Sequence, residues 1–135
     1  MNIVLAIHPK WASLIYSGEK TIEWRKSFPK IYYPRMEIFL YETAPVCRVT
    51  GYFTLAGTAR FQNVDWTKAD AHHKKFIDAG CVPAEDLNAY QEPHRRLRAW
   101  GVEIARKFEK PEGLPLEFFG ITTAPQSWCY TKMEI

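Results

Sequence analysis

The sequence has few cysteines and no long hydrophobic run. Its three cysteines, Cys47, Cys81 and Cys129, are odd in number and widely spaced, so they indicate neither a disulfide framework nor a CxxC metal-binding knuckle. Reduced thiols are typical of the cytoplasm, and we expect that location. No apolar stretch approaches the roughly 20 residues that a membrane-spanning helix needs. The first residues lack the charged and then apolar pattern of a signal peptide.

Motifs of several enzyme classes are also missing. The chain contains no glycine-rich phosphate loop, no nucleophile elbow and no set of residues with metal-ligand spacing. His72 and His73 are adjacent, so on a helix they would point about 100° apart and could not easily bind one ion. We therefore expect no metal and no other cofactor.

What is present is typical of a small globular protein. The 135 residues are 47% hydrophobic and 24% charged, which predicts one domain over 1–135 with one core. The net charge is only +3, but the first 35 residues hold six basic and two acidic side chains. This asymmetry indicates an anionic partner for the N-terminal third, although it is weaker than that of a strong duplex-DNA binder.

The hydrophobic pattern predicts a mixture of strands and helices, an α+β fold. Residues 2–7 are nearly all apolar and predict a buried strand. A short amphipathic helix from Pro9 to Ser17 follows, and Gly18 is expected to end it. From Thr21 a second strand is expected. Other elements predicted by period-two or helical spacing are strands near 36–42, 49–61 and 100–105, and a helical segment at about 64–98. Residues 124–130 are expected to form a closing loop and strand.

Three details of these elements can be checked. The 49–61 strand should bend at Gly57, because interior glycines mark bulges and corners in small barrels. In the helical segment, Asp65 is expected as an N-cap and Gly80 as the stop of the first helix. The basic run His94–Arg98 either contacts phosphates or forms the solvated face of a helix.

The charged stretch Gly18–Lys26 is the one around which the other elements are arranged. Side chains should alternate along the strand, so that Thr21, Glu23 and Arg25 face one way and Ile22 and Trp24 the other. A carboxylate between cations, with aromatic residues nearby, suits an anionic, planar ligand such as a nucleotide. The same spacing also fits an ordinary ion pair on a solvated strand. The aromatic loop over 27–35 is open to two interpretations as well, base stacking or covering one end of a barrel.

The residues 18–25, GEKTIEWR, match the G-x-K-x-x-E-x-R signature of the ASCH domain, a branch of the PUA-like superfamily. Three further blocks resemble that family: LAIHPKWA at 5–12, YETAPV at 41–46 followed by VTGYF at 49–53, and APQSWCY at 124–130. The last block resembles the ending of small stand-alone members that are often associated with phages. The resemblance implies a PUA-like small mixed β-barrel of about five to six strands, flanked by short helices. It also implies a cleft lined by Lys20, Glu23 and Arg25.

The resemblance also implies a function in nucleic-acid metabolism. Members are generally proposed to bind RNA or modified nucleosides, some resemble ribonucleases, and others are amidohydrolases that deacetylate an acetylated cytidine with a lysine, a threonine and a glutamate. The family's lysine falls on Lys20, but the position of the threonine nucleophile falls on Glu23. A carboxylate cannot simply replace that hydroxyl, so the departure weakens the amidohydrolase interpretation.

Our leading hypothesis is a module that binds RNA, single-stranded nucleic acid or a modified nucleoside, as a monomer or weak dimer. Lys20 and Arg25, with Lys10 or Lys26, would hold phosphate, and Glu23 would orient Arg25 or accept a hydrogen bond from a base. Further candidate binding residues, from the aromatic positions and the C-terminal block, are Trp11, Trp24, Phe28, Gln126, Ser127 and Trp128. The alternative is a metal-independent hydrolase with Lys20 and Glu23 as catalytic groups. A third hypothesis is an accessory protein that acts through protein contacts alone.

Overall fold

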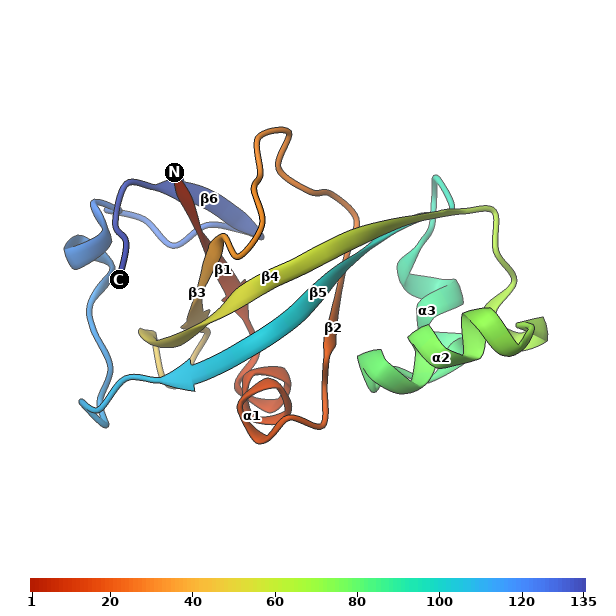
Figure 1. Cartoon of the computed structure of the whole chain (residues 1–135), viewed down its shortest axis with the longest axis horizontal. Helices are drawn as coiled ribbons and strands as arrows, with labels where there is room; N and C mark the ends of the chain where they lie inside the picture. Colours follow the sequence, from red (N-terminus) through yellow and green to blue (C-terminus); the bar gives the residue numbers. More distant parts are fainter.

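The computed structural model describes all 135 residues as a six-stranded sheet with three α-helices (Figure 1). The strands are β1 (Asn2–Ile7), β2 (Ile22–Arg25), β3 (Glu37–Glu42), β4 (Arg48–Gln62), β5 (Arg96–Lys107) and β6 (Trp128–Thr131). The helices are α1 (Pro9–Ser17), α2 (Ala71–Gly80) and α3 (Ala84–Tyr90), with single 3-10 turns at Trp66–Lys68 and Leu116–Phe119. The predicted α+β class is confirmed.

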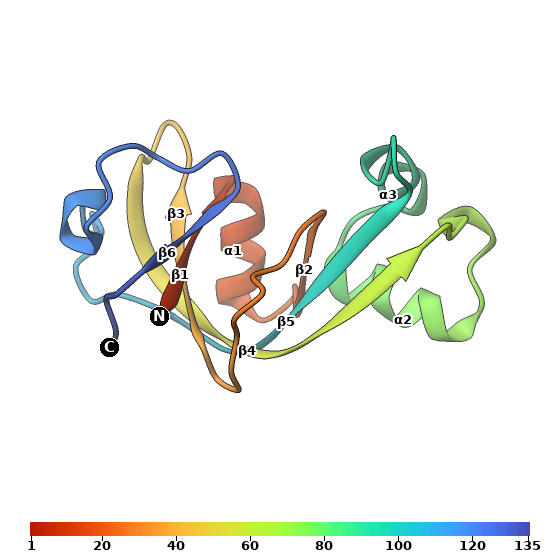
Figure 2. The ribbon, with the colours of Figure 1, turned by 90° about the horizontal axis from the view of Figure 1, so that it is seen from above.

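The sheet has the strand order β2-β5-β4-β3-β1-β6, and only the β1–β3 pair is parallel. β4 and β5 form a long twisted pair that extends from β3 to the helices α2 and α3 (Figure 2). Its register shifts on both sides of Leu55, and Gly57 has a φ of +145°, so the predicted bend is confirmed. The edge strands β2 and β6 do not pair with each other. The expected barrel is therefore not closed by backbone hydrogen bonds; the strands form a curled, open sheet.

Side chains join the two edges where the sheet is open. The guanidinium of Arg25, at the end of β2, donates to the Ala6 carbonyl at 2.7 Å and to the Ser127 hydroxyl at 3.2 Å. The Trp128 indole donates to the Ser27 hydroxyl at 2.9 Å. These contacts hold β2 against the ends of β1 and β6, so the two edges keep a fixed relative position.

Two of the buried clusters explain how the helices sit on the sheet. α1 packs through Ala12 and Ile15 onto a cluster formed by β1, β3, β4 and β5. The second cluster lies where the end of the β4–β5 pair meets α3 and the 3-10 turn at Trp66–Lys68; its buried members are Trp24, Phe61, Trp66, Leu87, Leu97 and Ala99. Trp24 is only 5% exposed, so it is a core residue rather than a free stacking group.

The helical segment differs from its prediction in three places. α2 continues through Gly80 and is capped by Cys81 at a φ of +59°. Gly80 is needed inside the helix because the helix packs there against Trp24, where only glycine fits. Asp65 caps the 3-10 turn, whereas Asp70 caps α2. The run His94–Arg98 lies in a turn and the first residues of β5, so its interpretation as a helix face was wrong. None of the helices has the length and hydrophobicity required to span a membrane.

Candidate functional site

The turn after α1 brings the charged stretch into position. Gly18 adopts a left-handed conformation with a φ of +86° and donates its N–H to the Ile15 carbonyl, which ends the helix. The Lys20 N–H then bonds to the Leu14 carbonyl at 3.0 Å, and the chain enters β2. β2 pairs antiparallel with β5. The predicted alternation is confirmed, because Trp24 packs in the core while Glu23 and Arg25 face the opposite side.

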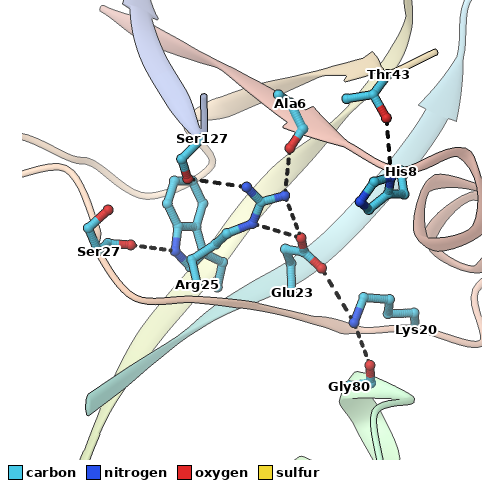
Figure 3. Close-up of polar contacts among 10 residues, drawn as sticks. Ala6, His8, Lys20, Glu23, Arg25, Ser27, Thr43, Gly80 and Ser127 are labelled. Carbon is cyan, nitrogen blue, oxygen red and sulfur yellow. Dashed lines mark hydrogen bonds and ion pairs between the residues drawn. The ribbon is translucent and has the colours of Figure 1, made fainter. Parts of the chain in front are cut away.

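Lys20, Glu23 and Arg25 form one continuous charged cluster (Figure 3). The Lys20 Nζ lies 3.4 Å from Glu23 Oε1, and Arg25 donates from Nε to Glu23 Oε2 at 2.9 Å while its Nη2 lies 2.8 Å from the same oxygen. Lys20 also donates to the carbonyl of Gly80, the last residue of α2. Only 1% of Lys20 and 4% of Glu23 is exposed. The interpretation as an ion pair on a solvated strand was therefore wrong.

Arg25 makes several contacts within the protein. Its Nε and Nη2 hold Glu23, Nη2 also donates to the Ala6 carbonyl, and Nη1 donates to the Ser127 hydroxyl. These contacts fix the carboxylate of Glu23, with one oxygen toward Arg25 and the other toward Lys20. The phosphate-binding role expected for Arg25 stays a prediction.

Burial changes the acid–base behaviour of Lys20. Desolvation lowers the pKa of Lys20 below its usual value of 10.5, and the nearby carboxylate of Glu23 only partly offsets this. A lysine with a lowered pKa releases its proton more readily than a surface lysine, so it can serve as a base or as an electrostatic stabiliser.

We expect Lys20 to titrate at a lower pH than the other lysines when the protein is followed by ¹³C NMR of labelled lysine Cε atoms. Between the folded pKa of Lys20 and its unfolded value of about 10.5, the unfolded chain binds more protons than the folded one. The contribution of Lys20 to stability therefore rises with pH across this window. Glu23→Gln should lower the pKa of Lys20 further, because it removes the charge that raises it. A Lys20 midpoint at or above 10.5 would contradict this picture.

A cavity of about 490 Å³ adjoins the charged cluster. It lies among β1, α1, β2, α3 and the loops after β3 and before β6. Its lining residues are Ala6, Ile7, His8, Trp11, Lys20, Glu23, Trp24, Arg25, Thr43, Val82, Asp86, Leu87, Tyr90, Pro125 and Gln126. We call this cavity the triad pocket.

The triad pocket combines apolar walls with a few polar groups. Trp11 and Tyr90 supply aromatic surface, and the Trp11 ring lies 5.0 Å from the Lys20 Nζ. Two basic residues, Lys20 and Arg25, are balanced by two acidic ones, Glu23 and Asp86. A volume within the usual range of about 300–1,000 Å³, with mostly apolar walls and a small number of polar groups, is typical of small-molecule sites.

The structure brings together some of the sequence-predicted site residues and separates others. Six of them line the triad pocket: Trp11, Lys20, Glu23, Trp24, Arg25 and Gln126. The remaining predicted residues do not line it; these are Lys10, Lys26, Phe28, Ser127 and Trp128. Lys10 is exposed, with its Nζ 4.7 Å from the Trp11 ring. Ser127 contacts Arg25, and thus supports the site from outside the cavity.

The sequence did not identify the contribution of α3. Val82, Asp86, Leu87 and Tyr90 form one wall of the triad pocket, although about 60 residues separate them from Lys20. The Leu87–Tyr90 spacing indicated a helix but not what that helix covers. The side chains of His8 and Thr43 lie 3.3 Å apart at the pocket. Both residues belong to blocks that resemble the family, but the sequence pattern assigned neither of them a role.

Comparison with known proteins gives the family. The protein-family model of the ASCH domain matches residues 5–112 of this chain. The chain belongs to the ASCH domain family. A search of the curated proteins finds no match to this ASCH protein.

Solved structures agree with this assignment. The ASCH protein of Zymomonas mobilis has a TM-score of 0.78 at 22% identity, covering 97% of this chain and 87% of its own. A point variant of that protein gives the same TM-score and identity, with 97% and 88% covered. Protein EF3133 of Enterococcus faecalis is more distant, with a TM-score of 0.50 at 13% identity, covering 74% of this chain and 72% of its own. These likenesses confirm the ASCH fold; the association with phages stays a prediction.

Proposed function

We propose that the triad pocket of this ASCH protein binds a single nucleobase, either in a free nucleoside or in an unstacked nucleotide of single-stranded RNA. The observation that carries the proposal is a pocket with aromatic walls whose charges cancel. Bases outside a duplex are commonly recognised by stacking on aromatic side chains and by hydrogen bonds to their edges. Trp11 and Tyr90 can supply the first, and Glu23, Asp86 and Gln126 the second.

The charge balance favours a neutral group over a phosphate in this pocket. Arg25 is occupied by four protein contacts, and Lys20 already serves Glu23 and the Gly80 carbonyl. Lys20 nevertheless has three N–H donors, so one can still serve a ligand. A base presents hydrogen-bond donors and acceptors but carries no full charge. It therefore suits a pocket that offers polar groups and whose charges cancel.

Trp11→Ala should weaken nucleoside binding by about 5- to 150-fold, because stacking on one aromatic side chain contributes about 1–3 kcal/mol. The measurement is a fluorescence or NMR titration with the four common nucleosides and an acetylated cytidine. Phe118→Ala is the control, since Phe118 is an exposed aromatic residue outside the pocket. Equal affinities for wild type and Trp11→Ala would reject a stacking role, and no binding of any nucleoside or short RNA would reject the proposal.

A second candidate function is hydrolysis, favoured by the buried Lys20 with its lowered pKa. The Thr43 hydroxyl lies in the same pocket beside His8, so a nucleophile is available although the family's threonine position holds Glu23. Incubation of RNA and of acetylated cytidine with chelator present separates the two functions. Product that forms in wild type and not in Lys20→Met would favour a metal-independent hydrolase, whereas binding without product would favour the binding module.

A further inference from the structure

A second cavity, of about 480 Å³, has only basic residues among its charged lining groups. Lys26, Arg60, Arg96 and Arg98 line it, together with Ser27, Phe28, Phe61, Gln62 and Leu97. We call it the arginine groove. None of its four cations forms an ion pair with a carboxylate. The groove therefore concentrates positive charge, in contrast to the balanced triad pocket.

The sheet register places these charges close together. Arg60 of β4 lies directly opposite Arg98 of β5, and Arg98 is also paired in register with Arg25 of β2. Like charges directly opposite each other destabilise an antiparallel pair. Burial and the neighbouring Arg60 both lower the pKa of Arg98. An arrangement of this kind is stabilised by an anion, which offsets the repulsion when it binds.

Arg98 also lacks a partner for one donor. Its guanidinium carbon lies 4.8 Å from the centre of the Phe28 ring, and its Nε is buried with no hydrogen-bond partner. A buried donor without an acceptor is unfavourable, because it has lost its hydrogen bonds to water. Arginine presents its donors in a planar fork that fits the oxygens of a phosphate. An anion with several oxygens is thus the ligand that these groups suit.

The arginine groove adjoins the triad pocket. The Lys26 Nζ, in the groove, lies 5.0 Å from the centre of the Tyr90 ring and donates to the Glu92 carbonyl. Tyr90 in turn lines the triad pocket. Phe28 and Tyr32 pack edge to face beside the groove, with ring centres 4.9 Å apart. Cations interleaved with aromatic rings are characteristic of surfaces that bind single-stranded nucleic acid.

We propose that the arginine groove binds the phosphodiester backbone of the single-stranded nucleic acid whose base enters the triad pocket. This inference rests on the proposed function. It assigns the two requirements of such a ligand to different places: the balanced pocket receives the base, and the groove receives the charge. Phosphate contacts position a ligand without reading its sequence, so the groove supplies affinity and the pocket supplies selectivity.

The test compares two double variants that each remove two exposed charges. Arg60→Gln/Arg96→Gln alters the groove, and Lys74→Gln/Lys75→Gln alters exposed lysines on α2. Fluorescence anisotropy follows a labelled RNA of about ten nucleotides, and an abasic strand of the same length, over a salt series. Each phosphate contact contributes about 0.7 to the slope of log affinity against log salt for single strands. The groove variant should lose about 1.4 of this slope for both strands, and the lysine variant should match wild type.

The outcomes separate this inference from the proposed function. A slope unchanged in the groove variant, or reduced equally in the lysine variant, overturns the inference. Nucleosides that bind the groove variant as they bind wild type would support the division of roles. If nucleosides fail to bind but the abasic strand binds through the arginines, the pocket proposal fails and the groove is supported. If the groove binds inorganic tripolyphosphate or a polyglutamate peptide but neither nucleic-acid strand, the assignment of a phosphodiester ligand is overturned.

Discussion

Replacing Glu23 with alanine is expected to lower the free energy of unfolding by about 3–5 kcal/mol, a large part of the 5–15 kcal/mol typical of a domain. Glu23 is the one carboxylate between two cations. Its removal leaves Lys20 buried without a countercharge and removes one hydrogen bond and the ion pair of Arg25. Denaturant unfolding of wild type and variant, followed by circular dichroism, measures the difference.

Glu23→Gln is the matched variant, because it keeps the shape and one acceptor but removes the charge. It should cost less than Glu23→Ala and still lower the stability. A loss below about 1 kcal/mol for Glu23→Ala would mean that the cluster behaves as an exposed ion pair. That result would contradict the burial of Lys20 and Glu23.

Local patterns in the sequence were sufficient for the elements around the site. The apolar run of β1, the glycine after α1 and the alternation of β2 are each determined by residues close in the chain. They correctly predicted that Trp24 packs into the core while Glu23 and Arg25 pair on the other face of the strand. The long β4 strand was likewise visible from its period of two.

The partners of the charged residues could not be predicted in the same way. Arg25 finds its acceptors on Ala6 and Ser127, which the open edge of the sheet brings together from opposite ends of the chain. Lys20 finds the Gly80 carbonyl 60 residues away. Such contacts depend on tertiary packing, and no local spacing records them. For this reason the sequence suggested that Glu23 orients Arg25 but did not reveal the acceptors on Ala6 and Ser127.

The N-terminal excess of positive charge has a different meaning in the folded protein. Lys20 and Arg25, two of its members, are offset by Glu23 inside the triad cluster. The four basic residues of the arginine groove have no acidic partner; Lys26 belongs to the N-terminal third, but Arg60, Arg96 and Arg98 come from β4 and β5. The anionic partner suggested by the sequence is therefore better matched by a surface that the fold assembles than by the N-terminal third alone.

Gly80→Ala is expected to lower the free energy of unfolding by about 3 kcal/mol, as overpacking of a core does. A Cβ at this position would collide with Nε1 of the Trp24 indole and lie 2.7 Å from its Cδ1. Trp24 is wedged between Phe61 and Trp66, with ring centres 5.7 and 5.2 Å away, so it has little room to move. The collision should also displace the Gly80 carbonyl that accepts from Lys20.

A double-mutant cycle with Trp24→Phe tests this explanation. Phenylalanine lacks the five-membered ring that holds Nε1 and Cδ1, the atoms nearest the added Cβ. In the Trp24→Phe background, Gly80→Ala should therefore cost little, and alanine's higher helix propensity at the end of α2 can make it neutral. The expected coupling is about 2–3 kcal/mol, within the range for residues in direct contact. An equal cost in both backgrounds would mean that Gly80 is required for the backbone of α2 rather than for the approach of Trp24.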